Sequence, residues 1–213
     1  MNFLEQDLDD YVVAHSENEP ALLYELNRQT HIKILQPRML SGHFQGRVLS
    51  MLSHMIQPKN ILEIGTYTGY SALCFAEGLK AGGKITTIDI NYELEDMVRE
   101  YIAKAELENT IDFKVGNAMN IIPTMNEEFD LVFIDADKGN YVNYYNLVFD
   151  KVKKGGYIIA DNVLWSGKVL EDYASLDKDT QVLMDYNTMV QKDERVQTVL
   201  FPIRDGLNIA RKL

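Results

Sequence analysis

Acidic residues close several of the short apolar runs in this sequence. These residues are Glu63, Asp89, Asp135 and Asp161. In parallel sheets, ligands collect beyond the carboxyl ends of the strands, so a carboxylate at such an end is well placed to bind one. A single carboxylate there can equally cap the following helix. Four of them on one rim of a sheet favour a functional site.

Two of these carboxylates belong to a set of oxygen donors suited to a metal ion. Asp135 begins the segment Asp135-Ala136-Asp137-Lys138, and Asp161 is followed by Asn162. Two carboxylates and an amide oxygen are ligands that Mg²⁺ or a similar hard cation prefers. Histidine and cysteine are absent from the set, which argues against zinc. The alternative is an Asx-type turn at Asp161-Asn162 without a metal.

The segment after the first apolar run indicates a nucleotide-containing cofactor. Gly65 and Gly69 let the backbone turn tightly and approach a ligand, and the helix start that follows favours an anionic group. Tyr67 stands where a dinucleotide fingerprint has its second glycine, so that fingerprint is not present. Asp89, at the end of the next run, can accept both hydroxyls of a ribose.

The order of the expected elements predicts an α/β fold that positions these residues. Strands are expected at 61–64, 85–89, 111–115, 131–135, 157–161, 195–201 and 206–211, and helices at 70–81, 92–107, 117–125, 138–153 and 177–192. Alternation of this kind predicts a Rossmann-like, seven-stranded, mostly parallel sheet with helices on both faces. The short segment around Asp205 allows only a hairpin, so the last strand should be antiparallel.

The N-terminal part has a different pattern and is expected to be a helical cap. Helical spacing begins at Leu4, a helix start is expected at Pro20, and a third pattern covers 42–56. We predict one domain over 1–213, with a cap or lid at 1–57 and a cofactor-binding α/β core at 58–213.

Composition limits the classes of function. The chain has 213 residues, 46% of them hydrophobic, and a formal net charge of −11, which argues against broad affinity for nucleic acid. The N-terminus lacks the features of a signal peptide and no run is apolar enough for a membrane span, so a cytoplasmic location is expected. Cys74 has no cysteine partner and should be a small core residue.

In these features the sequence closely resembles the cation-dependent, class I S-adenosylmethionine O-methyltransferases, the group that contains caffeoyl-CoA and catechol O-methyltransferases. The resemblance runs from about Met39 to the C-terminus. Its most specific segments are 61–71, 129–138, 155–167 and 202–212.

The resemblance implies a role for each matching residue. The cofactor would be S-adenosylmethionine. Its expected contacts are Glu63, Gly65 and Thr66 at the methionine end, Ser71 near its carboxylate, Asp89 at the ribose, Asn117 and Ala118 at the adenine, and Met39 and Ser41 in a segment closing over it, with Asp135 as a further contact. Asp135, Asp161 and Asn162 would bind Mg²⁺, Mn²⁺ or Ca²⁺, and Lys138 would be the general base.

The chemistry that these roles imply is deprotonation of an aromatic hydroxyl followed by methyl transfer. A cation bound at the hydroxyl oxygen favours its anionic form. A lysine accepts a proton only as the neutral amine, which burial and nearby positive charge favour. The alternative for Lys138 is a surface lysine at a helix start, a position that is electrostatically unfavourable for a cation.

Several alternatives remain open at this stage. The acceptor is expected to be a vicinal hydroxyl of a catechol-like small molecule or, by the same mechanism, 5-hydroxyuridine in transfer RNA. A nicotinamide-dependent dehydrogenase and a non-catalytic cofactor-binding protein are remote alternatives, since neither explains the paired carboxylates. His43 and Phe44 depart from the plant pattern, which puts coenzyme A esters in doubt. The resemblance also implies a homodimer.

Four residues near the proposed site have two interpretations each. Tyr141 and Tyr145 share a helix face, which favours core packing over substrate stacking. Trp165 either walls the acceptor pocket or packs elsewhere. Asp205 either reaches the acceptor or only stabilises the hairpin turn.

Overall fold

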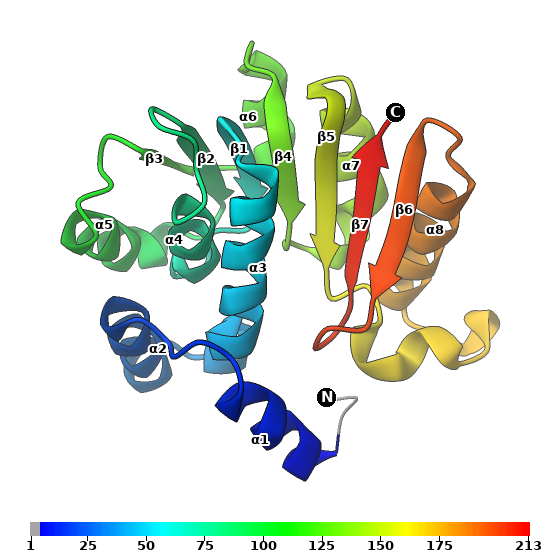
Figure 1. Ribbon diagram of the computed structural model, residues 1–213. Coiled ribbons are helices and arrows are strands. Elements are labelled where there is room, and N and C mark those ends of the chain that lie inside the picture. Colours follow the sequence, from blue (N-terminus) through cyan, green and yellow to red (C-terminus); the bar gives the residue numbers. More distant parts are fainter. Residues whose placement is uncertain (1–4) are drawn as a thin grey trace. The chain divides into compact units, whose positions relative to one another are not determined.

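The computed structural model describes residues 5–213, which divide into two compact units, 5–118 and 119–213 (Figure 1). Leu4 of the first helical pattern lies outside the described residues. The first unit contains α1 (Gln6–Ala14), α2 (Ala21–Lys33), the 3₁₀ turn η1 (Pro37–Met39), α3 (Gly42–Ile56), β1 (Asn60–Ile64), α4 (Tyr70–Ala76), β2 (Lys84–Asp89), η2 (Tyr92–Leu94), α5 (Glu95–Lys104) and β3 (Ile111–Val115). The single domain predicted from the sequence remains a prediction.

The second unit carries the C-terminal strands and two long helices. After α6 (Ala118–Ile121) and η3 (Ile122–Thr124) come β4 (Phe129–Ile134), η4 (Lys138–Asn140), α7 (Tyr141–Phe149), β5 (Val152–Asp161), η5 (Trp165–Leu170), η6 (Tyr173–Ser175), α8 (Lys178–Lys192), β6 (Val196–Phe201) and β7 (Leu207–Lys212). Helices α7 and α8 pack against each other and against strands of this unit. Among residues 5–213, no helix is both long and apolar enough to cross a membrane.

The strand pairing follows the prediction. The order is β3-β2-β1 in the first unit and β4-β5-β7-β6 in the second. Strands β1, β2 and β3 pair in parallel, as do β4 and β5. Strand β7 is antiparallel to both of its neighbours, β5 and β6, which confirms the predicted hairpin. Gly206 has a φ of +91° in this hairpin turn, and a Cβ there would lie 2.5 Å from Leu164 Cγ, so the turn requires glycine.

Three predicted helices are too long, and the one expected over 92–107 ends at Lys104. The helix expected over 70–81 ends at Ala76, and at Gly78 the chain passes so close to α3 that a Cβ would lie 2.2 Å from His54 N. The helix expected over 138–153 ends at Phe149, and β5 already begins at Val152. A register shift in the pairing of β4 with β5 accommodates Gly155, whose φ is +80°. The glycine therefore marks a bulge within the strand rather than its start.

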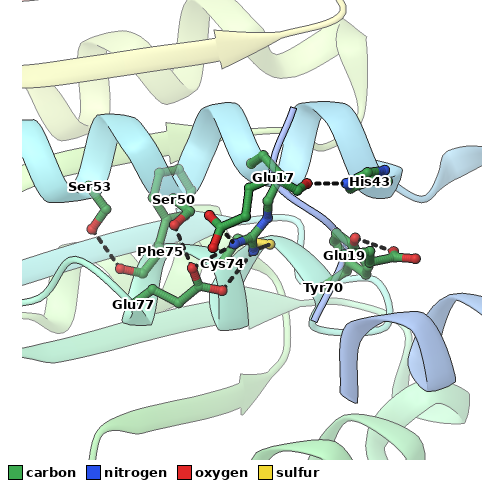
Figure 2. A network of polar contacts seen from close by, with 10 residues as sticks. Glu17, Glu19, His43, Ser50, Ser53, Tyr70, Cys74, Phe75 and Glu77 are labelled. Carbon is green, nitrogen blue, oxygen red and sulfur yellow. Dashed lines mark hydrogen bonds and ion pairs between the residues drawn. The ribbon is translucent and has the colours of Figure 1, made fainter. Parts of the chain in front are cut away.

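A buried arginine, Arg47, joins α3 to the end of α4, and Figure 2 shows its neighbours Ser50 and Glu77. The two Nη atoms of Arg47 donate to the two carboxylate oxygens of Glu77, at 2.9 and 2.7 Å, and Ser50 Oγ donates to the same carboxylate. The segment between α1 and α2 is attached beside this pair. His43 Nε2 lies 2.6 Å from the carbonyl oxygen of Glu17, and the Tyr70 hydroxyl donates to Glu19. The same network therefore fixes the two helices and the N-terminal segment.

We expect Arg47→Met to lower the free energy of unfolding by about 1–3 kcal/mol, because it leaves the Glu77 carboxylate without its bidentate partner. Urea denaturation measures this loss. Arg99→Met is the matched control, since Arg99 forms an exposed pair with Glu95 in which the arginine side chain is 56% exposed. Its loss should stay below about 0.5 kcal/mol. Equal losses in the two variants would contradict a stabilising role for the buried pair.

Candidate functional site

The turn after β1 has the backbone shape that the glycine pattern predicts. Gly65 and Gly69 have φ values of 99° and 88°, in the left-handed region that favours glycine. Gly65 N donates to the carbonyl oxygen of Ile88, at 2.9 Å, which ties the turn to the end of β2. Gly69 is the N-terminal cap of α4. The turn therefore lies against β2 and leads directly into a helix start.

Glu63 lies at the centre of a buried polar cluster. Its side chain is 0% exposed, and its carboxylate accepts hydrogen bonds from Ser71 Oγ, at 2.6 Å, and from Thr87 Oγ1. Thr66 Oγ1 lies 2.5 Å from Thr87 Oγ1. A buried carboxylate is stable only with such partners. Three predicted cofactor residues, Glu63, Thr66 and Ser71, are thus brought together around one hydrogen-bonded cluster.

Asp89 links the turn after β1 with the loop after β2. Its Oδ2 accepts from Tyr67 N, at 2.6 Å, and its Oδ1 accepts from Asn91 N, at 2.8 Å. Because each carboxylate oxygen has two acceptor positions, both oxygens keep capacity for the hydroxyls of a ribose. Gly116 N donates to the Asp89 carbonyl oxygen, at 2.8 Å, which places the chain just before Asn117 and the buried Ala118 beside Asp89.

Tyr67 attaches the segment before α3 to the same turn. The sequence pattern used this residue only to exclude a dinucleotide fingerprint. The Tyr67 hydroxyl donates to the carbonyl oxygen of Gln36, at 2.9 Å. Further along this segment, Met39 is 57% exposed, whereas Ser41 is buried. Tyr67 thus holds in place the segment that carries Met39 and Ser41.

In the second unit, the predicted base and two predicted metal ligands converge. The Lys138 side chain is 9% exposed, and Nζ donates to Asp135 Oδ1 at 3.1 Å, to Asn162 Oδ1 at 2.8 Å and to the Tyr141 hydroxyl at 2.6 Å. An ammonium group has three N–H donors, and each has an acceptor here. The side chains that follow β4 and β5 therefore surround one positive group.

The donor chemistry fits a divalent cation. The ammonium of Lys138 shows that Asp135 and Asn162 direct oxygens at a common positive centre. Asp161 is 2% exposed, and its Oδ1 accepts from Asn162 N at 2.7 Å. Within residues 5–213, no group of three or more histidine, cysteine, aspartate or glutamate side chains is placed to hold a metal. A cation here would thus be bound by two carboxylates and an amide oxygen, a set that suits Mg²⁺.

Tyr141 is a contact of Lys138 that the sequence analysis missed. The residue is 0% exposed, and its hydroxyl donates to the Asp161 carbonyl oxygen at 2.9 Å. Burial, with the nearby charges of Asp135 and Asp161, raises the pKa of Tyr141 well above its ordinary value, so it keeps its proton. Tyr145 is equally buried and donates to Asp193 at 2.9 Å, which confirms the packing role predicted for both tyrosines. The three-residue spacing from Lys138 allows the contact but does not determine the direction of the tyrosine hydroxyl.

The loop after β5 brings an aromatic ring to the same lysine. Lys138 Nζ lies 5.7 Å from the centre of the Trp165 ring. Trp165 and Ser166 have positive φ values, 45° and 56°, and Ser166 N donates to the Asp205 carboxylate. Burial raises the pKa of Asp205. Asp205 therefore supports the loop that carries Trp165, and a contact of either residue with an acceptor remains a prediction.

Comparison with known proteins identifies the family. A sequence model described as O-methyltransferase matches residues 13–213. A caffeoyl-CoA O-methyltransferase of Petroselinum crispum is 37% identical over 206 residues, which cover 92% of this chain and 85% of the relative.

Two solved structures match almost the whole chain. The SAH-bound methyltransferase PaMTH1 of Podospora anserina has a TM-score of 0.89 and 28% identity, covering 100% of this chain and 98% of its own. The O-methyltransferase TomG of Streptomyces achromogenes, in complex with SAM, has a TM-score of 0.88 and 26% identity, covering 99% of each chain. These matches confirm the Rossmann-like fold of seven strands, mostly parallel with β7 antiparallel and with helices around them. The chain belongs to the S-adenosylmethionine-dependent O-methyltransferase family.

Proposed function

We propose that this enzyme is metal-dependent and methylates one of two adjacent hydroxyls on a catechol-like aromatic small molecule. The observation that carries the proposal is the convergence of Asp135, Asn162 and the buried Lys138 at the carboxyl ends of two neighbouring strands. Such a set combines donors for a hard cation with a proton acceptor. The caffeoyl group in the relatives' name is itself a catechol, which supports this class of acceptor.

The cofactor residues proposed for this chain lie in the first unit, except Asp135. Glu63, Gly65 and Thr66 would line the methionine end of S-adenosylmethionine, Ser71 its carboxylate, Asp89 the ribose, and Asn117 with Ala118 the adenine, with Met39 and Ser41 closing over it. Asp135 is proposed as a further contact of the cofactor. The buried cluster at Glu63 and the two N–H groups that orient Asp89 support these assignments. Preorganised partners of this kind hold binding groups in place before the cofactor arrives.

The residues of the second unit would prepare the acceptor. Asp135, Asp161 and Asn162 would hold the divalent ion, which when bound favours the anionic form of the acceptor hydroxyl. Lys138, after losing one proton from its ammonium group, would accept the hydroxyl proton on Nζ as the neutral amine. S-adenosylmethionine, held by the residues named above, would supply the methyl group to that oxygen and be left as S-adenosylhomocysteine. Orientation of the two reactants supplies much of the acceleration.

We expect Asp89→Asn to weaken binding of S-adenosylmethionine by about 10- to 100-fold, because the charged acceptor of the ribose hydroxyls is lost. Isothermal titration with the cofactor measures the Kd. Asp112→Asn removes an exposed carboxylate of neighbouring β3 and should leave the Kd unchanged. Equal affinity in wild type and Asp89→Asn would remove Asp89 from the proposed cofactor site.

The acceptor is tested by a parallel assay of labelled methyl transfer. The panel contains simple catechols, caffeoyl-CoA and transfer RNA that carries 5-hydroxyuridine, each with Mg²⁺. We expect transfer to the free catechols. Transfer to the RNA alone would establish the alternative function by the same mechanism, and transfer to none of them would contradict the proposal. A homodimer and a cytoplasmic location remain predictions.

A further inference from the structure

We infer that Tyr141 is a positioning residue whose hydroxyl keeps Lys138 in place when a divalent cation takes the oxygens of Asp135 and Asn162. The inference rests on the proposed function, since it assumes both the metal ligands and the role of Lys138. It goes beyond that function because it gives a role to a fully buried tyrosine of α7. The tyrosine hydroxyl would hold the lysine ammonium apart from a metal ion that binds the same oxygens.

The hydrogen-bond partners of Lys138 differ in whether they are also proposed metal ligands. Nζ has three hydrogen-bond acceptors, and two of them, Asp135 Oδ1 and Asn162 Oδ1, belong to the proposed metal ligands. The Tyr141 hydroxyl, at 2.6 Å, does not. A metal ion and an ammonium group repel each other and compete for oxygens that both require. Of these three acceptors, only the tyrosine hydroxyl is left to the lysine once an ion is bound.

The tyrosine hydroxyl is itself held in a fixed position. Its oxygen accepts from Lys138, and its own proton goes to the carbonyl oxygen of Asp161, at 2.9 Å. That carbonyl belongs to the last residue of β5, which pairs with Leu207 of β7. The ring of Tyr141 packs edge-on against Tyr186, with 5.6 Å between the ring centres. The sheet and the core thus fix the hydroxyl, so it can serve as a stationary anchor.

Two effects should follow from removing the hydroxyl. In Tyr141→Phe, the lysine keeps only partners that the metal also needs, so its charge competes more strongly and metal binding weakens. When metal is bound, the lysine loses its fixed contact and is no longer held at the distance that proton transfer requires. Removal of groups that orient metal-site residues typically costs about 10- to 100-fold in metal affinity or activity.

The test measures Mn²⁺ affinity by equilibrium titration and kcat with a catechol acceptor. We expect Tyr141→Phe to raise the Mn²⁺ Kd about 10-fold and to lower kcat by about 10- to 100-fold, with the acceptor KM nearly unchanged. Tyr145→Phe is the control, because it removes the hydroxyl of an equally buried tyrosine of α7 that contacts Asp193 instead. Its affinity and kcat should equal those of the wild type. Equal losses in both variants would attribute the effect to packing and overturn the inference.

A double-mutant comparison tests whether the tyrosine acts through the lysine. In a Lys138→Met background, Tyr141→Phe should leave the Mn²⁺ Kd within about 2-fold, because no competing cation remains. A loss as large as in the wild-type background would overturn the inference, as would unchanged affinity and kcat in Tyr141→Phe alone. A wild type that neither binds Mn²⁺ nor needs it for activity would instead overturn the proposed function, so the two failures are distinguishable.

Discussion

Lys138→Met is expected to lower kcat for methyl transfer by about 10²- to 10⁴-fold, the range that a positioned general base contributes. Lys138 is buried, and its Nζ lies among Asp135, Asn162 and Tyr141. The variant keeps a side chain of similar length but has no group that accepts the acceptor's proton. Steady-state kinetics with a catechol acceptor and saturating Mg²⁺ measure the loss.

Measuring cofactor binding distinguishes the loss of a general base in Lys138→Met from a general disruption of the folded enzyme. The Kd for S-adenosylmethionine should stay within about 2-fold of the wild-type value in Lys138→Met, because Asp135 is the one proposed cofactor residue among the three partners of Lys138. Lys153→Met is the control, since Lys153 pairs with Asp130 near the start of β5. That variant should retain wild-type kcat. If Lys138→Met turned over at the wild-type rate, Lys138 would be excluded as the base.

Removal of divalent metal should have an effect of similar size. Dialysis against a chelator is expected to lower methyl transfer by about 10³-fold, because cation stabilisation of a developing oxyanion contributes several kcal/mol. Added Mg²⁺ or Mn²⁺ should restore the rate. Zn²⁺ should restore less, since the donors around Lys138 are oxygens. Full activity in the presence of chelator would exclude the metal from the reaction.

The sequence predicted most of the sheet and the residues at its carboxyl edge. The apolar runs predict β1, β2 and β3 within one residue of their observed bounds, because each strand places apolar side chains in the core. The short segment around Asp205, between the last two strands, predicted the antiparallel hairpin. The convergence of Asp135 with Asn162 followed from one rule, that neighbouring parallel strands end at the same edge.

The missed features depend on contacts that no local pattern reports. The bulge at Gly155 arises from the pairing of β4 with β5, and the early end of α4 arises from close packing on α3 at Gly78. Tyr67 was informative in the sequence only because it occupies a position where a dinucleotide fingerprint has glycine. In the structure its hydroxyl attaches the segment that contains Met39 to the turn after β1. Tyr141 looked like an ordinary core residue because its burial was predictable, whereas the direction of its hydroxyl was not.

The central claim is that Asp135, Asp161 and Asn162 bind one divalent ion, and equilibrium binding of Mn²⁺ tests it most directly. We expect one ion per chain in the wild type and at least about 10-fold weaker binding in Asp135→Ala and in Asp161→Ala. Asp130→Ala, which removes a carboxylate that pairs with Lys153, should bind like wild type. Unchanged Mn²⁺ binding in both ligand variants would contradict the claim.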